Sequence, residues 1–246
     1  MTTQRKEPHT LTLQLGETAD PLRIVLPSGD IPAEEILPAL RVMTNAVIDH
    51  AIAATQAKGR PISCRSGCAT CCRHLVLLSD IEARVLADLV AGMPEPRRST
   101  IQARFTAAQQ RMAEAGLAEP VGNQASLPVD HLHKLAYRYF QQRIDCPFLE
   151  DEQCSIYADR PLACRKLAVT SPAEFCANPV DERVTNLRVA PVGAAVLLVT
   201  SDEAPPQPAG VLLPYMLDWA AADTSPRPRR GADQWMQRFV ERLADS

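Results

Sequence analysis

Cysteines dominate the chemistry available to this chain: there are eight, and four of them fall within nine residues. These four are Cys64, Cys68, Cys71 and Cys72. If residues 68–72 form the first turn of a helix, thiols at positions i, i+3 and i+4 share one face, and Cys64 can join them from the preceding loop. Gly67 supplies the backbone freedom that such a turn often needs. A helix amino terminus also lowers thiol pKa values and so favours the thiolates that metals require. The spacing therefore predicts a metal or iron–sulfur site.

The other four cysteines lie in the turn-rich segment 145–176: Cys146, Cys154, Cys164 and Cys176. Their spacings are too long for one helical turn, so we expect this segment to wrap a site as a loop. Two prolines stiffen the segment and four apolar side chains supply a shell: Pro147, Pro161, Phe148, Leu149, Ile156 and Tyr157. Neither cysteine group has enough neighbouring apolar sequence to bury a charged centre alone. We therefore expect the two groups to meet in space, brought together by a helical hairpin between them.

Charge compensation is needed at such a site, because four thiolates around a zinc ion or a [4Fe–4S] cluster leave a net charge of about −2. Four arginines near the cysteines can offset it: Arg65, Arg73, Arg160 and Arg165. Ordinary surface charge explains them equally well, because exposed arginine is common. His74 also lies beside the first group, and two interpretations stay open for it: an auxiliary metal ligand, or a side chain that caps or packs.

The expected compartment is the cytoplasm. Residues 1–10 contain no apolar stretch behind a basic one, so we expect no secretory signal. The apolar run of residues 189–200 is too short to cross a bilayer. In a reducing cytosol, grouped cysteines bind metals or catalyse more often than they form disulfides, and four disulfides are the alternative interpretation.

Composition indicates a folded protein, which we interpret as a single domain spanning residues 1–246. Apolar residues make up 46% and charged residues 22%, so wholesale disorder is excluded. The formal net charge is −3 and aromatic residues make up 4%, which argues against nucleic-acid and anionic-membrane partners. The composition does not argue against an unidentified protein partner.

Hydrophobic periodicity predicts a mainly α fold with a small β element, in which irregular cysteine-rich loops wrap around a metal or iron–sulfur centre. Strands are expected at 11–15, 22–26 and 186–200, and helices at 32–58, from 79 to about 91, and at 96–116, 129–143, 210–221 and 232–244. The helix over 32–58 carries an apolar stripe: Ile36, Leu40, Met43, Val47, Ala51 and Ala54. Ser79 and Glu82 have the spacing of a capping box, which gives them and Asp80 a structural role. The cysteine region, about 60–177, thus lies between an N-terminal strand and helix and C-terminal helices.

The cysteine pattern resembles a known family. Cys64-x3-Cys68-x2-Cys71-Cys72, followed downstream by Cys-Pro-Phe-Leu, Cys-x-Ile-Tyr-x-x-Arg-Pro and Cys-Arg, is similar to the YkgJ-type cysteine-cluster family of zinc- or iron-chelating domains. The resemblance implies that seven cysteines are metal ligands or cluster neighbours: Cys64, Cys68, Cys71, Cys72, Cys146, Cys154 and Cys164. Cys176 lies outside the best-known part of the pattern. One branch, the flagellin lysine N-methylases, is implied to use an iron–sulfur cluster with S-adenosylmethionine, but those proteins are longer and their additional regions are not matched here.

Two enzyme classes fit less well. The trio Cys64, Cys68 and Cys71 has the spacing of the radical S-adenosylmethionine signature, but Thr70 stands where that superfamily usually has an aromatic residue, and no two glycines are adjacent. A nucleophilic cysteine needs a nearby base, and His74 alone lies close in sequence. No catalytic residue is assigned.

The expected function is therefore a cytoplasmic protein that binds an iron–sulfur cluster, such as [4Fe–4S], in a redox or metal-handling role. Zinc and mononuclear iron are the alternative cofactors. Two alternative functions remain: a metal-dependent modifying enzyme similar to the methylase branch, and an interaction module in which zinc is purely structural. Both centres accept thiolate ligands, so the preference for iron rests on the resemblance.

Overall fold

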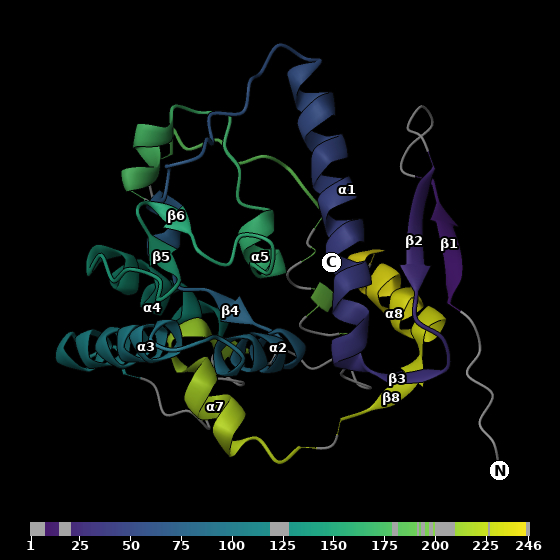
Figure 1. The fold of residues 1–246 in the computed structure, drawn as a ribbon. Helices are drawn as coiled ribbons and strands as arrows, with labels where there is room; N and C mark the ends of the chain where they lie inside the picture. Colours follow the sequence, from purple (N-terminus) through teal and green to yellow (C-terminus); the bar gives the residue numbers. More distant parts are fainter. Residues whose placement is uncertain are drawn as a thin grey trace.

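The computed structural model describes residues 8–14, 21–118, 128–178, 182–190, 192, 195–196, 199, 210–225 and 227–244. Its helices are α1 (Leu37–Gln56), α2 (Asp80–Ala91), α3 (Arg97–Glu114), α4 (Val129–Gln141), α5 (Leu162–Arg165), α7 (Met216–Ala222) and α8 (Ala232–Ala244). Short 3-10 turns are η1 (Ala33–Ile36), η2 (Thr70–Arg73), η4 (Ala173–Ala177) and η5 (Leu213–Tyr215). The mainly α class is confirmed (Figure 1).

The described residues form four small antiparallel sheets, each with two strands, and two of these sheets join segments that are far apart in sequence. β1 (His9–Leu13) pairs with β2 (Leu22–Leu26), and β3 (Asp30–Pro32) with β8 (Arg229–Gly231). β4 (Leu77–Leu78) pairs with β7 (Val211–Leu212), and β5 (Leu149–Glu150) with β6 (Gln153–Cys154). The β3–β8 and β4–β7 pairs join the N-terminal half of the chain to the C-terminal elements.

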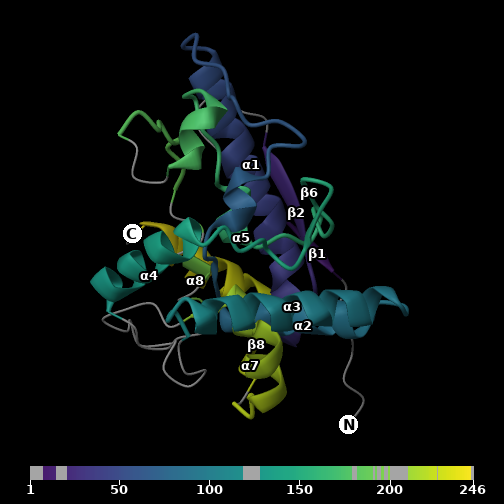
Figure 2. The same ribbon diagram turned by 90° about the vertical axis from the view of Figure 1, so that its left-hand side faces the viewer.

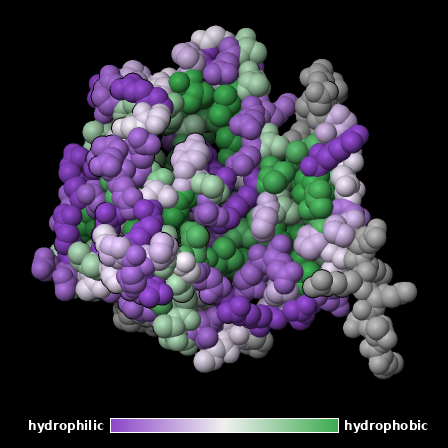
Figure 3. Space-filling model, in the orientation of Figure 1, coloured by the Kyte–Doolittle hydropathy of each residue, from purple (hydrophilic) through white to green (hydrophobic). Residues whose placement is uncertain are grey.

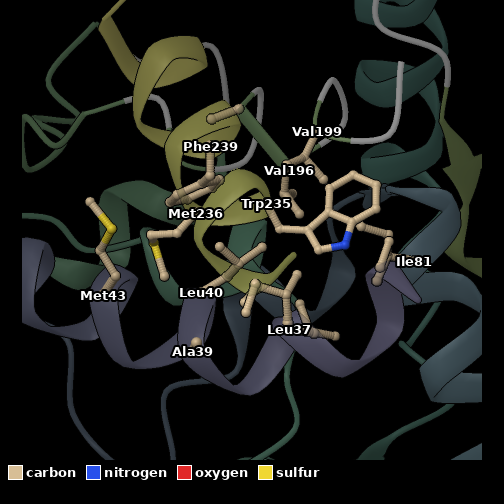
Figure 4. Packing of buried hydrophobic residues seen from close by; sticks show 14 of the residues in the cluster. Leu37, Ala39, Leu40, Met43, Ile81, Val196, Val199, Trp235, Met236 and Phe239 are labelled. Atoms are coloured by element: carbon tan, nitrogen blue, oxygen red, sulfur yellow. The ribbon is translucent and has the colours of Figure 1, made fainter. Parts of the chain in front are cut away.

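The main core lies where α1 meets α8 and the β1–β2 hairpin. Trp235 of α8 is fully buried, and its indole Nε1 donates a hydrogen bond of 3.1 Å to the carbonyl oxygen of Ile31. Leu37, Leu40 and Met43 face α8 from α1 (Figure 4). Burying these large side chains removes their apolar surface from water, which is the main favourable term in folding. The first and last elements of the described chain therefore share one core.

The apolar stripe predicted for α1 is confirmed along part of its length. Ile36, Leu40 and Met43 are buried, whereas Val47 and Ala51 are half-buried and Ala54 is exposed. Figure 1 shows the reason, because the C-terminal end of α1 projects beyond α8 and the hairpin. The stripe loses α8 and the hairpin as packing partners there, and Ala51 packs instead against a smaller cluster of Ile48, Ala168 and Leu187.

The strand predicted over 186–200 is wrong where the structure describes this stretch. Residues 192, 195 and 196 are helical, and an isolated bridge pairs Asn186 with Val169. Val192, Val196 and Val199 are buried in the main core. A short apolar run without polar alternation suits a buried helical turn as well as a strand, so periodicity could not separate them.

The predicted helix over 210–221 begins later than expected. Val211 and Leu212 pair with β4, η5 follows, and α7 starts at Met216. The predicted loop over 119–128 lies almost entirely outside the described residues.

One helix among the described residues is long and apolar enough for a membrane span. The continuous helical stretch Ala33–Gln56 has 24 residues, contains an 18-residue window with a mean hydropathy of 1.2, and lies near the N-terminus. The core helix of a soluble protein passes the same test, and this helix packs its apolar face against α8. In Figure 3 apolar residues gather over α1 and the hairpin, whereas the side of α3 and α4 is mainly hydrophilic.

Candidate metal centre

The first cysteine group forms a tight turn and not the start of an α-helix. Cys71 and Cys72 lie in η2, whereas Cys68 precedes it and donates its backbone N–H to the carbonyl oxygen of Arg65 at 3.1 Å. Gly67 has φ +80°, a left-handed conformation that glycine adopts without steric cost, as the sequence predicted. The turn ends at His74, whose extended backbone leads into β4. The predicted helix is therefore wrong, because the chain must extend here to pair with β7.

The two cysteine groups meet, as predicted. The backbone N–H of Cys146 donates a hydrogen bond of 2.8 Å to the carbonyl oxygen of Cys72. The β5–β6 hairpin then reverses the chain and sets Cys154 opposite Leu149. Cys164 follows on α5, which lies beside α1 (Figure 2). The long segment between β5 and α5 thus curls back towards the first group.

Cys64 and Cys176 join the same site from its outer side. Cys64 Sγ accepts a hydrogen bond of 3.4 Å from the backbone N–H of Val169, and Ser63 N–H donates to the carbonyl oxygen of Val169 at 2.9 Å. η4, which carries Cys176, packs against η2. All eight cysteines are free thiols.

Charge interactions divide the thiols into two neighbourhoods around Cys71. Cys176 lies close enough for its charge to interact with those of Cys64, Cys68 and Cys71. On the inner side, Cys71 interacts with four further cysteines: Cys72, Cys146, Cys154 and Cys164. Cys71 is therefore the thiol shared by an outer and an inner neighbourhood.

The thiols differ in how readily they ionise. A hydrogen bond from the Cys72 thiol, opposed by burial, lowers the pKa of Cys71 to about 6, and the nearby Arg160 guanidinium adds to this effect. The same hydrogen bond raises the pKa of Cys72. Burial raises the pKa of Cys146 to about 12 and raises that of Cys164 strongly. Without a metal, Cys71 is thus the favoured thiolate and the inner thiols keep their protons.

The donor set fits zinc or iron, although its atoms are not arranged as a finished site. Among the residues that the structure describes, no three Cys, His, Asp or Glu side chains stand together in the geometry of a metal site. Thiolates are nevertheless soft ligands that select zinc and iron–sulfur clusters. The site offers this kind of ligand, because eight free thiols from separate segments lie in one region.

Two of the four arginines near the cysteines have partners other than the thiols. Arg73 forms salt bridges with Asp145 at 2.8 Å and with Glu152 at 2.9 Å. Arg165 is buried and donates to the carbonyl oxygen of Arg160 at 2.9 Å, to Asn45 Oδ1 at 3.0 Å and to the carbonyl oxygen of Ala158. These two arginines brace the cysteine-bearing segments against each other and against α1.

Arg160 is placed to compensate thiolate charge at two cysteines, and Arg165 adds to its effect at Cys154. The charge of Arg160 interacts with those of Cys71 and Cys154. Its guanidinium carbon lies 4.0 Å from the centre of the exposed Tyr157 ring, and its buried Nε has no hydrogen-bond partner. Arg65, in contrast, is exposed on the first cysteine loop.

His74 packs against an aromatic side chain. Its ring meets that of Phe140 edge-on, with 4.8 Å between the ring centres, and burial lowers the pKa of its imidazole. This geometry agrees with the packing interpretation of His74.

Glu82 does more than the sequence predicted. The capping box with Ser79 is confirmed. In addition, Glu82 Oε1 accepts a hydrogen bond of 2.7 Å from the backbone N–H of Leu162, the first residue of α5. The spacing of Ser79 and Glu82 could reveal only the local cap, because a contact with a residue so distant in sequence leaves no local pattern.

Comparison with protein families agrees with this geometry. Residues 63–181 match the family model CxxCxxCC, described as "Putative zinc- or iron-chelating domain". We call this matched stretch the cysteine-cluster domain. The cysteine-cluster domain begins just before Cys64 and includes Cys176, which the motif resemblance had left outside. No curated protein and no solved structure matches the chain. The family supports chelation of zinc or iron by this domain.

Proposed function

We propose that the cysteine-cluster domain binds an iron–sulfur cluster or a metal ion in the cytoplasm and serves a redox or metal-handling role. The observation that carries the proposal is the hydrogen bond between Cys146 N–H and the carbonyl oxygen of Cys72, which joins the two cysteine groups into one site. Packing alone gives no reason to gather eight reduced thiols there. Iron is preferred to zinc on the strength of the motif resemblance.

The protein's own residues would hold and enclose the centre. The inner ligand candidates are Cys72, Cys146, Cys154 and Cys164, the outer ones are Cys64, Cys68 and Cys176, and Cys71 lies between the two sets. Cys146 and Cys154 pack against a core formed by α2, α3 and α7, which keeps water from that side. Arg160 offsets part of the thiolate charge. A bound iron–sulfur cluster would supply one-electron transfer, whereas zinc would supply structure or Lewis acidity.

We also propose that this site exchanges electrons or metal with a protein partner. We do not propose a nucleic-acid or membrane partner, because the chain carries a formal charge of −3 and few aromatic residues.

Anaerobic purification tests the proposal. The full chain would be prepared without air, and its absorption spectrum would be recorded together with its iron, acid-labile sulfide and zinc content. We expect a brown protein with stoichiometric iron and sulfide that bleaches in air. Stoichiometric zinc with negligible iron would overturn the iron assignment, and the absence of both metals after reconstitution would overturn the function.

Structural zinc is the second candidate, and one observation favours it. The regular segments that carry cysteines are short: η2, β6, α5 and η4 have two to five residues each. Such segments contain few backbone hydrogen bonds of their own, so a metal that links them would contribute directly to folding. A purified protein that holds zinc, does not exchange it and shows no redox activity would support the structural-zinc function.

A further inference from the structure

Glu82 is an acidic residue held almost entirely away from water. Its residue surface is 2% exposed. Oε2 accepts hydrogen bonds from the backbone N–H of Ser79 at 3.2 Å and from its hydroxyl at 3.1 Å. The Ser79 hydroxyl in turn accepts from the backbone N–H of Glu82 at 3.2 Å. These bonds complete the cap of α2 and use one of the two carboxylate oxygens.

The second oxygen reaches a different part of the chain. Oε1 accepts from Leu162 N–H at 2.7 Å, and Leu162 is itself fully buried. Pro161, the residue before α5, offers no side-chain cap. The first N–H groups of a helix have no partner inside the helix. Without Glu82, the amide of Leu162 would be buried and unsatisfied, which costs more than an ordinary hydrogen bond contributes.

This contact fixes one cysteine-bearing segment to another. α2 follows the first cysteine group through His74 and β4, whereas Leu162 stands two residues before Cys164. Cys164 lies near enough to interact with the charges of Cys71, Cys146 and Glu82. The other end of α5 is held separately, by the hydrogen bonds of Arg165. Glu82 thus sets where α5 begins relative to the first cysteine group.

We propose that Glu82 is a positioning residue for Cys164 and that it acts through the reach of its side chain, which spans from the cap of α2 to the first amide of α5. The inference rests on the proposed function only in taking Cys164 as a ligand. The placement of Cys164 can be measured in metal-free protein.

Three variants separate reach, charge and capping. Glu82→Asp keeps the negative charge and an acidic group in the first turn, but its carboxylate is one methylene too short to serve both Ser79 and Leu162. Glu82→Gln keeps the length and an amide oxygen that can accept from Leu162 N–H, but it removes the charge. Ser79→Ala removes the cap hydroxyl and leaves the bond to Leu162 in place.

The measurement is the alkylation rate of Cys164 in reduced, metal-free protein, read by peptide mass spectrometry with Cys154 as internal reference. We expect Glu82→Asp to speed Cys164 alkylation by at least about tenfold, because losing the hydrogen bond to the buried Leu162 amide loosens the turn. Glu82→Gln and Ser79→Ala should stay within about threefold of wild type, although Ser79→Ala lowers the melting temperature. Zinc affinity should likewise fall most in Glu82→Asp and little in Glu82→Gln and Ser79→Ala.

Several outcomes would overturn the proposal. An unchanged rate in Glu82→Asp would show that reach does not matter, and an equal rise in Glu82→Gln would assign the effect to charge. An equal rise in Ser79→Ala would assign it to the cap. If Glu82→Asp does not fold, hydrogen exchange of the Leu162 amide in wild type decides: slow exchange supports the bond, and exchange at the rate of an open loop refutes it. A wild type that binds no metal but shows these alkylation rates would refute the proposed function alone.

Discussion

The backbone nitrogen of Cys146 lies 2.8 Å from the carbonyl oxygen of Cys72, although α2, α3 and α4 separate the two residues in sequence. This hydrogen bond joins main-chain atoms, so it fixes the two cysteine groups whatever their side chains do. The thiols are therefore brought together by the fold before any metal binds, and their final arrangement is left to the metal.

Removing thiols from the centre of the site should cost both metal and stability. We expect Cys71→Ser and Cys68→Ser to weaken zinc or iron binding by at least about a hundredfold, because ligand loss exceeds the effect of changing a neighbour of the metal. Binding energy is partly folding energy here, so the melting temperature of the loaded protein should also fall. Competition with a chromophoric chelator and thermal melts on the same samples measure both. His74→Ala is the control and should change metal affinity little; equal stability of wild type and both cysteine variants would contradict the prediction.

Cys176→Ser separates the outer neighbourhood from the inner one. Cys176 lies in η4 at the outer side of the site, near Cys64, Cys68 and Cys71. We expect this variant to lose metal bound by the outer thiols while keeping most of its stability, and the matched Cys164→Ser variant to lose both metal and stability. Metal content per chain and urea unfolding would be measured for both. Full retention of metal in Cys176→Ser would make Cys176 a neighbour and not a ligand.

Arg160 should control affinity through its charge. Replacing it by methionine keeps the packing on Tyr157 but removes the positive charge beside Cys71 and Cys154. We expect Arg160→Met to weaken metal binding about tenfold, and Arg160→Lys to restore part of the loss. Arg65→Met is the matched control, because Arg65 is exposed on the same site. If Arg65→Met and Arg160→Met lower metal affinity equally at low and at high salt, the prediction of a specific role for Arg160 is wrong.

Metal affinity should rise with pH. Burial raises the pKa values of Cys146, Cys154 and Cys164, so these thiols carry protons at neutral pH. Each must lose its proton to bind a metal, so binding is favoured as pH rises and is lost as pH falls. With at least two protons released, affinity between pH 6 and pH 8 should rise by about two powers of ten per pH unit. Calorimetry in buffers of different ionisation enthalpy counts the protons, and a count near zero would show that the thiols are already ionised.

Local signals in the sequence were sufficient for the capping box and for the left-handed turn at Gly67. The spacing of Ser79 and Glu82 and the presence of a glycine each act within a few residues, so the structure follows them. The meeting of the cysteine groups was also predictable, because charged thiolates need more apolar cover than either group carries. The η2 turn was not predictable in this way. Its conformation depends on the pairing of β4 with β7, a segment far along the chain.

Long-range contacts account for the other differences. The bond from Glu82 to Leu162 and the salt bridges of Arg73 join residues from separate segments, and no spacing rule connects them. Residues around Val196 read as a strand because their apolar run has no polar break, but tertiary packing made them helical.

The packing of Leu162 bears on where the domain can be cut. Leu162 and Ile81, both inside residues 63–181, belong to the same buried cluster as Leu40 of α1 and Trp235 of α8, which lie outside that range. We therefore expect that the stretch matched by the family model does not fold independently of the rest of this chain. Excised alone, it would expose one side of the very turn that carries Cys164. By covering this turn, α1 and α8 support the cysteine cluster from outside the matched stretch. A shortened protein for metal-binding studies should therefore retain both helices.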